Sequence, residues 1–275
     1  MGHGKLRKFE ENKLFSCLLQ PESADVLDVG ASSLVLKDHP VKGHWNEEMF
    51  GGTDAPIVLE LGCGRGEYTV ELAGRHPEIH YIGVDIKGAR LWKGAKFATE
   101  NGMRNVAFLR TRIEFIEAFF APGEVSEIWL TFSDPQPRSE NSRLTSPRFL
   151  ERYRSFLKPG GIVHLKTDSL FLHEYSKAVA LCNGLDILAC SEDLYGDGRE
   201  KLHASEMAAV CGQPAVDALF EVQTYYERMF LADGLSITYL SFRIDHAGDY
   251  AYPEWDKDYW KEVEGKRRSF GHRPR

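Results

Sequence analysis

The residues best suited to chemistry lie in one short stretch near position 60. Glu60 is followed by Gly62, Gly64 and Gly66 at alternate positions, and a β-branched and aliphatic run precedes them. Such a run is typical of a strand buried on both faces. The glycines let the backbone turn sharply and let a ligand approach the main chain. A helix pattern follows from Glu67, so the stretch predicts a strand, turn and helix suited to a nucleotide-like ligand.

Two details favour a ligand over a plain tight turn. The pattern is E-x-G-x-G-x-G, with a carboxylate at the strand end, and it differs from the G-x-G-x-x-G of dinucleotide sites. A second buried strand pattern ends in Asp85, about 20 residues beyond the turn, where an acid accepts hydrogen bonds from ribose hydroxyls. Asp85 can also cap the following helix, and the two roles are compatible. Together these residues resemble the S-adenosylmethionine (SAM) site of class I methyltransferases.

A second group of candidate residues follows later strand patterns. Asp134 and Pro135 end the stretch F-S-D-P, and the proline ring restricts the backbone beside the carboxylate. Asp168 follows the next strand, in K-T-D. The first and fourth strands of a class I methyltransferase sheet are neighbours, so Asp134 is expected to face the glycine turn. A further motif lies on a helical stretch and comprises Thr224, Tyr225, Tyr226 and Glu227.

Strand and helix patterns alternate through the middle of the chain. The strand patterns cover 57–61, 79–85, 105–110, 127–132, 161–167, 186–191 and 236–244. The helix patterns cover 67–74, 88–101, 113–120, 147–157, 170–182 and 218–232. This alternation predicts an α/β fold with a doubly wound, mostly parallel sheet covered on both faces. The SAM-site resemblance implies the seven-stranded, Rossmann-like form of class I methyltransferases.

Extensions are expected at both ends of the chain. We divide it into an N-terminal extension (1–54), a methyltransferase domain (55–244) and a polar, basic C-terminal extension (245–275) that wraps the domain. The first extension predicts a helix over 9–19, strand character over 24–36 and a loop over 39–52. Basic residues gather in the last ten positions, namely Lys266, Arg267, Arg268, Arg273 and Arg275. This tail either contacts phosphates or is solvated.

Composition excludes several classes of protein. The 275 residues are 43% hydrophobic and 27% charged, as in an ordinary globular protein, and the net charge of -7 argues against a general nucleic-acid binder. We expect no membrane span and no signal peptide. Five cysteines without C-x-x-C indicate a reducing cytoplasm, and scattered histidines predict no metal site. Monomer and homodimer both stay open.

The order of the motifs L-G-C-G-x-G-E, F-S-D-P, K-T-D and T-x-Y-E, with a final strand, resembles the tRNA (guanine-N7-)-methyltransferase family over residues 55–244. The resemblance implies a cytoplasmic enzyme that uses SAM to methylate N7 of a guanosine in the tRNA variable loop. It implies the cofactor-binding residues Glu60, Gly62, Gly64, Gly66, Asp85, Arg112 and Asp134. It implies Asp134 as the catalytic residue and the substrate-binding residues Arg138, Asp168, Thr224, Tyr225, Tyr226 and Glu227.

Three features depart from the family pattern. Arg112 stands where the family usually has an acid near the adenine. Gln136 replaces a tryptophan, so stacking of a base from that position is not expected. The loop 137–143 lacks most of the lysines and arginines of relatives, although phosphate neutralisation drives tRNA affinity. The basic C-terminal tail is the hypothesised replacement.

The implied chemistry needs little from the protein beyond positioning. N7 of guanine carries a lone pair and no proton, so no general base is required, and positioning and electrostatics supply most of the rate. Carboxylates such as Asp134 and Asp168 suit the cationic product. For Asp168 and Glu227 a capping hydrogen bond is the competing role. Two other functions stay open, a SAM enzyme with another acceptor and a non-catalytic RNA-binding subunit. The intact Glu60, glycine turn and Asp85 argue against the second.

Overall fold

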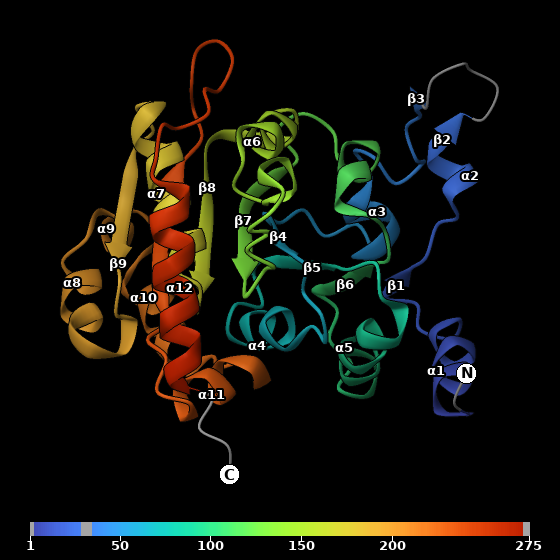
Figure 1. Cartoon of the computed structure of the whole chain (residues 1–275). Helices are drawn as coiled ribbons and strands as arrows, with labels where there is room; N and C mark the ends of the chain where they lie inside the picture. Colours follow the sequence, from blue (N-terminus) through green and yellow to red (C-terminus); the bar gives the residue numbers. More distant parts are fainter. Residues whose placement is uncertain (1–2, 29–34, 272–275) are drawn as a thin grey trace. The chain divides into compact units, whose positions relative to one another are not determined.

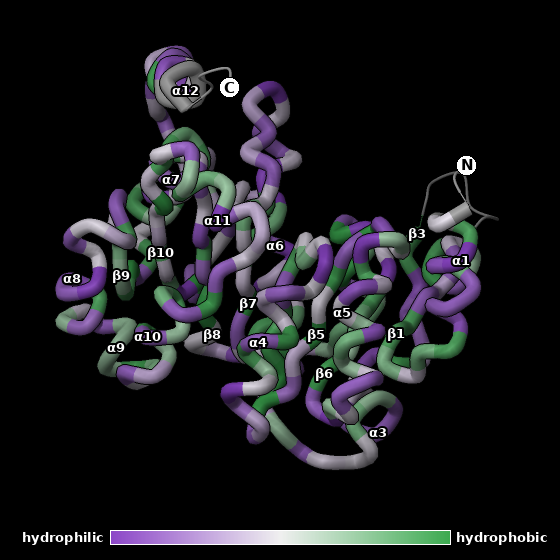
Figure 2. The backbone as a smooth tube through the Cα atoms, turned by 90° about the horizontal axis from the view of Figure 1, so that it is seen from below, coloured by the Kyte–Doolittle hydropathy of each residue, from purple (hydrophilic) through white to green (hydrophobic). Residues whose placement is uncertain are grey.

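The computed structural model describes residues 3–28 and 35–271 (Figure 1). The chain forms two compact units. The first comprises Met1–Ile128 and Ser155–Lys158, and the second comprises Trp129–Arg154 and Pro159–Arg275. Hydrophobic residues gather along the strands, and many of the turns between elements are hydrophilic (Figure 2).

The main sheet has the strand order β1-β6-β5-β4-β7-β8-β10-β9. Its strands are β1 (Leu18–Leu19), β4 (Ile57–Leu61), β5 (His80–Val84), β6 (Val106–Leu109), β7 (Val125–Thr131), β8 (Leu157–Thr167), β9 (Ile187–Ser191) and β10 (Thr238–Arg243). The pairs β1–β6, β6–β5 and β5–β4 are parallel, whereas β10 is antiparallel to both neighbours. A separate pair joins β2 (Leu27–Asp28) and β3 (Val35–Leu36). The predicted α/β class and mostly parallel sheet are confirmed.

The eighth strand corrects two predictions. The expected seven-stranded sheet gains β1, and the helix expected over 9–19 is instead α1 (His3–Asn12) followed by this strand. Backbone pairing explains the change: Phe108 N donates to Cys17 O at 2.7 Å and Arg110 N donates to Leu19 O at 2.9 Å. Without β1, β6 would be an edge strand and these N–H groups would have no strand partner. Pairing with β1 supplies that partner.

Helices connect the strands in both units. The first unit contains α2 (Ser23–Val26), α3 (Trp45–Met49), α4 (Glu67–Arg75), α5 (Gly88–Glu100) and the 3₁₀ helix η1 (Ile113–Ala118). The second contains η2 (Glu140–Ser142, 3₁₀), α6 (Pro147–Arg154), α7 (Leu170–Cys182), η3 (Leu194–Gly198, a π-helical turn), α8 (Arg199–His203), α9 (Glu206–Cys211), α10 (Gln213–Glu221), α11 (Tyr225–Ala232) and α12 (Lys257–Gly271).

Several predicted elements differ in type or length. The stretch 39–52 is not a loop throughout, because Trp45 begins α3, is fully buried and stacks on Phe120 at 5.1 Å between ring centroids. The stretch 24–36 starts with α2 and ends in the β2–β3 pair, and 29–34 lie outside the described residues. The helix expected over 113–120 is 3₁₀. The helix expected over 218–232 is divided into α10 and α11.

Candidate active site

The glycine turn in the first unit follows β4 directly. The N–H groups of Gly62 and Cys63 both donate to Val84 O, at 2.8 and 3.0 Å, which ties the turn to β5. Gly62, Gly64 and Gly66 have φ values of 78°, 57° and 68°, in the left-handed region that favours glycine. A Cβ on Gly66 would lie 2.5 Å from the Phe108 ring, whereas one on Gly62 would meet no described atom within 4 Å. Gly66 therefore serves packing, and Gly62 leaves open space for a ligand.

Glu60 holds the first turn of the helix that follows the glycines. Its side chain is buried, and Oε2 accepts hydrogen bonds from Thr69 N at 2.9 Å and from the Thr69 hydroxyl. A carboxylate at this end of α4 is also favoured by the partial positive charge of the helix N-terminus. Glu60 thus fixes the backbone beyond the turn.

Asp85 joins the glycine turn to the start of α5. One oxygen accepts a hydrogen bond from Gly64 N at 3.0 Å, and the other accepts one from Lys87 N at 2.7 Å. The structure therefore brings together the two features that the sequence singled out. Asp85 does not cap α5 as expected, because the N-cap is Lys87 and no side chain caps it. Asp85 instead holds the backbone just before the helix, and contact with a ribose stays a prediction.

Cys63, between the first two glycines, is poorly suited to nucleophilic chemistry because of its surroundings. Burial raises the pKa of its thiol well above the ordinary value, and the nearby carboxylates of Glu60 and Asp85 raise it further. The thiolate is the reactive form of cysteine, so burial and the raised pKa disfavour a nucleophilic role for this thiol.

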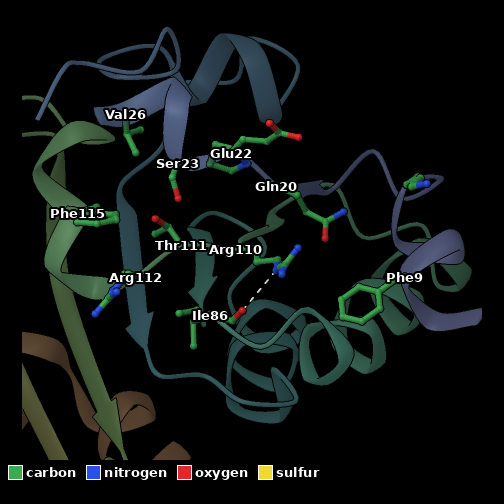
Figure 3. A pocket seen from close by; sticks show the side chains of 12 residues that line it. Phe9, Gln20, Glu22, Ser23, Val26, Ile86, Arg110, Thr111, Arg112 and Phe115 are labelled. Atoms are coloured by element: carbon green, nitrogen blue, oxygen red, sulfur yellow. Dashed lines mark hydrogen bonds between the residues drawn. The ribbon is translucent and has the colours of Figure 1, made fainter. Parts of the chain in front are cut away.

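A cavity of about 620 Å³ lies beyond the carboxyl ends of β5 and β6, where ligands of open α/β sheets bind (Figure 3). Ile86, directly after Asp85, lines it and is 52% exposed. Arg110 Nε donates to Ile86 O at 3.3 Å, and Phe115 contributes an aromatic wall. Phe9 of α1 also lines the cavity, so the N-terminal extension contributes to it. Sequence reasoning missed Ile86, although an apolar residue next to the predicted ribose-binding acid was a signal.

Arg112 also lines this cavity but is directed elsewhere. Its side chain is 58% exposed, pairs with Glu114 at 3.8 Å and lies over the Phe115 ring at 5.7 Å. In Figure 3 it points away from Arg110 and Thr111. The guanidinium therefore lies at the rim of the cavity.

In the second unit, Asp134 lies in a loop with unusual backbone geometry. Phe132 and Gln136 have φ values of 52° and 46°, a region that residues with a Cβ rarely adopt. Gln136 N donates to Asp134 Oδ1 at 3.0 Å. Asp134 is exposed, and so is Arg138 further along the loop. Strained backbone of this kind is often kept at functional sites, and it is invisible in the sequence because neither residue is glycine.

Asp168 follows β8 at the entrance to α7. It is buried, with 7% of its surface exposed. Ser169 caps α7 by accepting a hydrogen bond from Leu172 N at 3.2 Å, and its own N–H donates to Thr167 Oγ1 at 3.0 Å. The cap expected as the competing role of Asp168 is thus supplied by its neighbour.

The T-Y-Y-E motif forms the start of α11. Thr224 Oγ1 accepts a hydrogen bond from Glu227 N at 3.1 Å, and Glu227 Oε2 accepts one from Thr224 N at 3.4 Å. This capping box explains why the helix pattern over 218–232 breaks in two, and T-x-x-E is its sequence signature. Tyr225 and Tyr226 remain exposed, at 42% and 41%.

Glu227 is also one half of a buried ion pair. Its Oε1 lies 2.7 Å from Lys166 Nζ, and neither side chain is exposed to solvent. Tyr195 donates to the same oxygen at 2.7 Å. Burial lowers the pKa of Lys166, and Glu227 opposes that effect. No role was predicted from the sequence for Lys166 of K-T-D. The available signal was its place inside a strand whose residues 161–167 are all buried, as in a strand covered on both faces.

Among the residues that the structure describes, no group of three or more His, Cys, Asp or Glu side chains could hold a metal ion. In the same part of the chain, no helix has both the length and the apolar character needed to cross a membrane.

Comparisons with known proteins place these motifs in context. A family model described as "Putative methyltransferase" matches residues 54–203. The chain is 46% identical to a tRNA (guanine-N(7)-)-methyltransferase of Bacteroides thetaiotaomicron, over 92% of this chain and 91% of that protein. It is 44% identical to the protein of the same name from Bacteroides fragilis, over 98% of both chains. The one from Porphyromonas gingivalis is 47% identical over 84% of this chain and 89% of its own length.

Proposed function

The chain belongs to the tRNA (guanine-N(7)-)-methyltransferase family, and we propose from this premise that it transfers a methyl group from SAM to N7 of a guanosine in tRNA. The observation that carries the proposal is similarity over nearly the full length of relatives with that one name. Within tRNA, we propose that the acceptor lies in the variable loop.

The first unit has the features that SAM requires. Gly62 and Gly64 leave open backbone beside Asp85, and the cavity next to Ile86 provides an apolar wall for an adenine. We propose that Gly62, Gly64, Gly66 and Asp85 contact the cofactor, and that Glu60 acts by holding α4 through Thr69. Arg112, at the rim, supplies positive charge at the edge of this site. When bound, SAM supplies the electrophilic methyl group.

Exposed side chains of the second unit support a guanosine-binding role. We propose that Asp134 also contacts the cofactor, accepts hydrogen bonds from the N–H edge of the base and stabilises the positive charge that develops on methylation. Arg138, exposed on the same loop, contacts phosphate. The exposed rings of Tyr225 and Tyr226 suit stacking on bases.

Asp168, Thr224 and Glu227 have supporting roles in this proposal. We propose that Asp168 contributes negative charge to the base-binding region. Thr224 and Glu227 set the position of the tyrosines between them, since each is bonded to the other and Glu227 is inaccessible to solvent.

The proposed methyl transfer to N7 needs few catalytic groups. N7 is nucleophilic as it stands, so neither a general base nor a metal is needed, and the chain's contribution is to orient the base and its charge. We propose a cytoplasmic enzyme, consistent with five free cysteines. We also propose that the chain comprises an N-terminal extension (1–54), a methyltransferase domain (55–244) and a C-terminal extension (245–275).

The test is to incubate the protein with labelled SAM and unmodified tRNA, digest the tRNA with nuclease and identify the methylated nucleoside. We expect 7-methylguanosine. A different methylated nucleoside would reject the base assignment and favour the other-acceptor alternative. SAM binding measured by calorimetry, without transfer to any tRNA, would reject the tRNA assignment, and absence of SAM binding would favour the non-catalytic subunit.

A further inference from the structure

Arg143 is a charged side chain placed where water does not reach. Its side chain has no exposed surface, and all three guanidinium nitrogens are inaccessible to solvent. A buried charge is costly unless other groups compensate it. Arg143 closes the loop that begins at Phe132 and carries Asp134 and Arg138. The compensation for its charge therefore bears on how that loop is held.

Three aromatic rings surround the guanidinium. Its carbon lies 4.8 Å from the Phe171 ring centroid, 4.2 Å from that of Tyr175 and 5.4 Å from that of Trp255. We call these three rings the Arg143 cage. Glu140, at 3.8 Å, adds an opposite charge. Desolvated contacts between a cation and aromatic faces are among the stronger interactions of this kind, so the cage offsets the cost of burial.

One ring of the cage comes from far along the chain. Phe171 and Tyr175 belong to α7, whereas Trp255 lies in the C-terminal extension just before α12. A second contact joins the extension to the loop, because the Tyr252 hydroxyl donates to Asn141 Oδ1 at 2.5 Å. The extension is itself fixed beside α7, along which α12 runs in Figure 1. There Glu264 accepts a hydrogen bond from Phe171 N at 3.3 Å.

We propose that Arg143 and Trp255 are positioning residues for tRNA binding, through which the C-terminal extension holds the loop that carries Asp134 and Arg138. The proposal rests on the proposed function. The loop has strained backbone at Phe132 and Gln136 and is anchored at Arg143 by the cage. Without that anchor the loop would sample other conformations, and tRNA binding would bear the cost of ordering it.

The experiment compares Trp255→Ala with Trp255→Phe, which keeps a ring over the guanidinium. The matched control is Tyr259→Ala, which removes an aromatic ring of the same extension that is 56% exposed. For Trp255→Ala we expect the KM for tRNA to rise roughly tenfold, the scale of one lost cation–π contact. The SAM Kd should change far less than the KM for tRNA, because the glycine turn and the cavity next to Ile86 belong to the first unit and only Asp134 of the loop is proposed to contact the cofactor. Trp255→Phe and Tyr259→Ala should stay within about twofold of wild type.

A second readout follows the loop itself without using activity. Trypsin cuts after exposed Arg138, so the rate of cleavage between Arg138 and Ser139, followed by mass spectrometry, reports loop mobility. It should rise in Trp255→Ala and not in Trp255→Phe. Unchanged cleavage and KM in Trp255→Ala would overturn the inference. The inference would also be overturned if Trp255→Ala only lowered the amount of folded enzyme. In that case the SAM-binding stoichiometry and kcat would fall together while the KM for tRNA stayed constant. Failure of the proposed function looks different, because the wild type itself would then form no 7-methylguanosine.

Discussion

The contacts of Glu227 favour a supporting role over direct contact with a substrate. The carboxylate is shared between Lys166, Tyr195 and the backbone of Thr224, and no part of it is exposed. The family resemblance implied that Glu227 binds the substrate. The local contacts favour a role in holding α11 against β8. For Asp134, in contrast, exposure and strained flanking backbone agree with direct contact.

Replacing Glu227 by Gln should therefore act on stability first. The change leaves Lys166 buried without its counter-charge, and breaking such a pair costs about 3–5 kcal/mol. We expect urea unfolding to show a loss on this scale. Tyr225→Ala, on the exposed side of the same helix turn, should change the unfolding free energy by less than about 0.5 kcal/mol. A Glu227→Gln protein with unchanged stability but a raised KM for tRNA would restore the direct substrate role.

Two of the three glycines of the turn should also differ in whether they affect stability or SAM binding. Gly66→Ala forces a Cβ to within 2.5 Å of Phe108, so we expect it to destabilise the fold by about 2–4 kcal/mol. Gly62→Ala meets open space and bears mainly the left-handed backbone cost of about 1–2 kcal/mol. It should weaken SAM binding instead, by roughly tenfold if about 1.4 kcal/mol of contact is lost. Calorimetry and thermal unfolding of both variants decide this. Equal SAM affinities in Gly62→Ala and wild type would contradict the assigned cradle.

At the scale of elements, α3 fixes part of the N-terminal extension to β5. His80, at the start of β5, is buried, and its Nδ1–H donates a hydrogen bond to Asn46 Oδ1 at 2.9 Å. Its ring stacks on Phe50 at 4.0 Å between ring centroids. Burial lowers the pKa of His80, and Asp54 opposes the shift. Docking of α3 therefore favours the neutral imidazole.

This contact predicts a pH dependence with a definite sign. The unfolded chain protonates His80 near pH 6.5, and the folded protein does so only at lower pH. Between these values the unfolded state binds more protons, so stability falls as the pH drops below about 6.5 and levels off below the folded pKa. Melting temperatures from pH 7.5 to 5.5 should fall more steeply for the wild type than for His80→Gln. Parallel curves for the two proteins would refute the assignment.

Sequence patterns predicted the elements that carry a strong hydrophobic period, and missed those decided by tertiary contacts. The glycine turn, Asp85 and the helices around them were placed because strand and turn chemistry agree there. Trp45 was assigned to a loop because five residues of helix hold too little periodicity, while burial against Phe120 decides the structure. Likewise β1 depends on the open edge of β6. The cage at Arg143 joins residues more than a hundred positions apart, which no local pattern records.

At the scale of the whole molecule, two explanations of the C-terminal extension can be separated. In the first explanation, the basic tail neutralises tRNA phosphates in place of the loop 137–143, which has few basic residues. Arg273 and Arg275 of that tail lie outside the described residues. In the other, Trp255 holds the loop. Truncation after Ile244 removes both and should abolish tight tRNA binding. Changing Arg267, Arg268, Arg273 and Arg275 to Gln keeps Trp255.

The glutamine variant should show a flatter salt dependence of tRNA affinity. Each phosphate contact that is lost lowers the slope of log K against log[salt] by roughly 0.7–0.9. The tRNA affinities of the two proteins are compared by filter binding at salt concentrations from about 50 to 200 mM. A slope identical to that of the wild type would show that the tail does not contact tRNA phosphates. The C-terminal extension would then act only through Trp255 and the loop.

Methylation at N7 with Asp134 at the reacting base is the central proposal for this protein. The most direct measurement is the rate of 7-methylguanosine formation in unmodified tRNA by the wild type and by Asp134→Ala, with SAM affinity and unfolding measured on both. We expect 7-methylguanosine from the wild type and a loss of about 10²-fold or more in the folded variant, the scale of removing one electrostatic group from the transition state. A folded Asp134→Ala protein that forms 7-methylguanosine at the wild-type rate would contradict the assigned site.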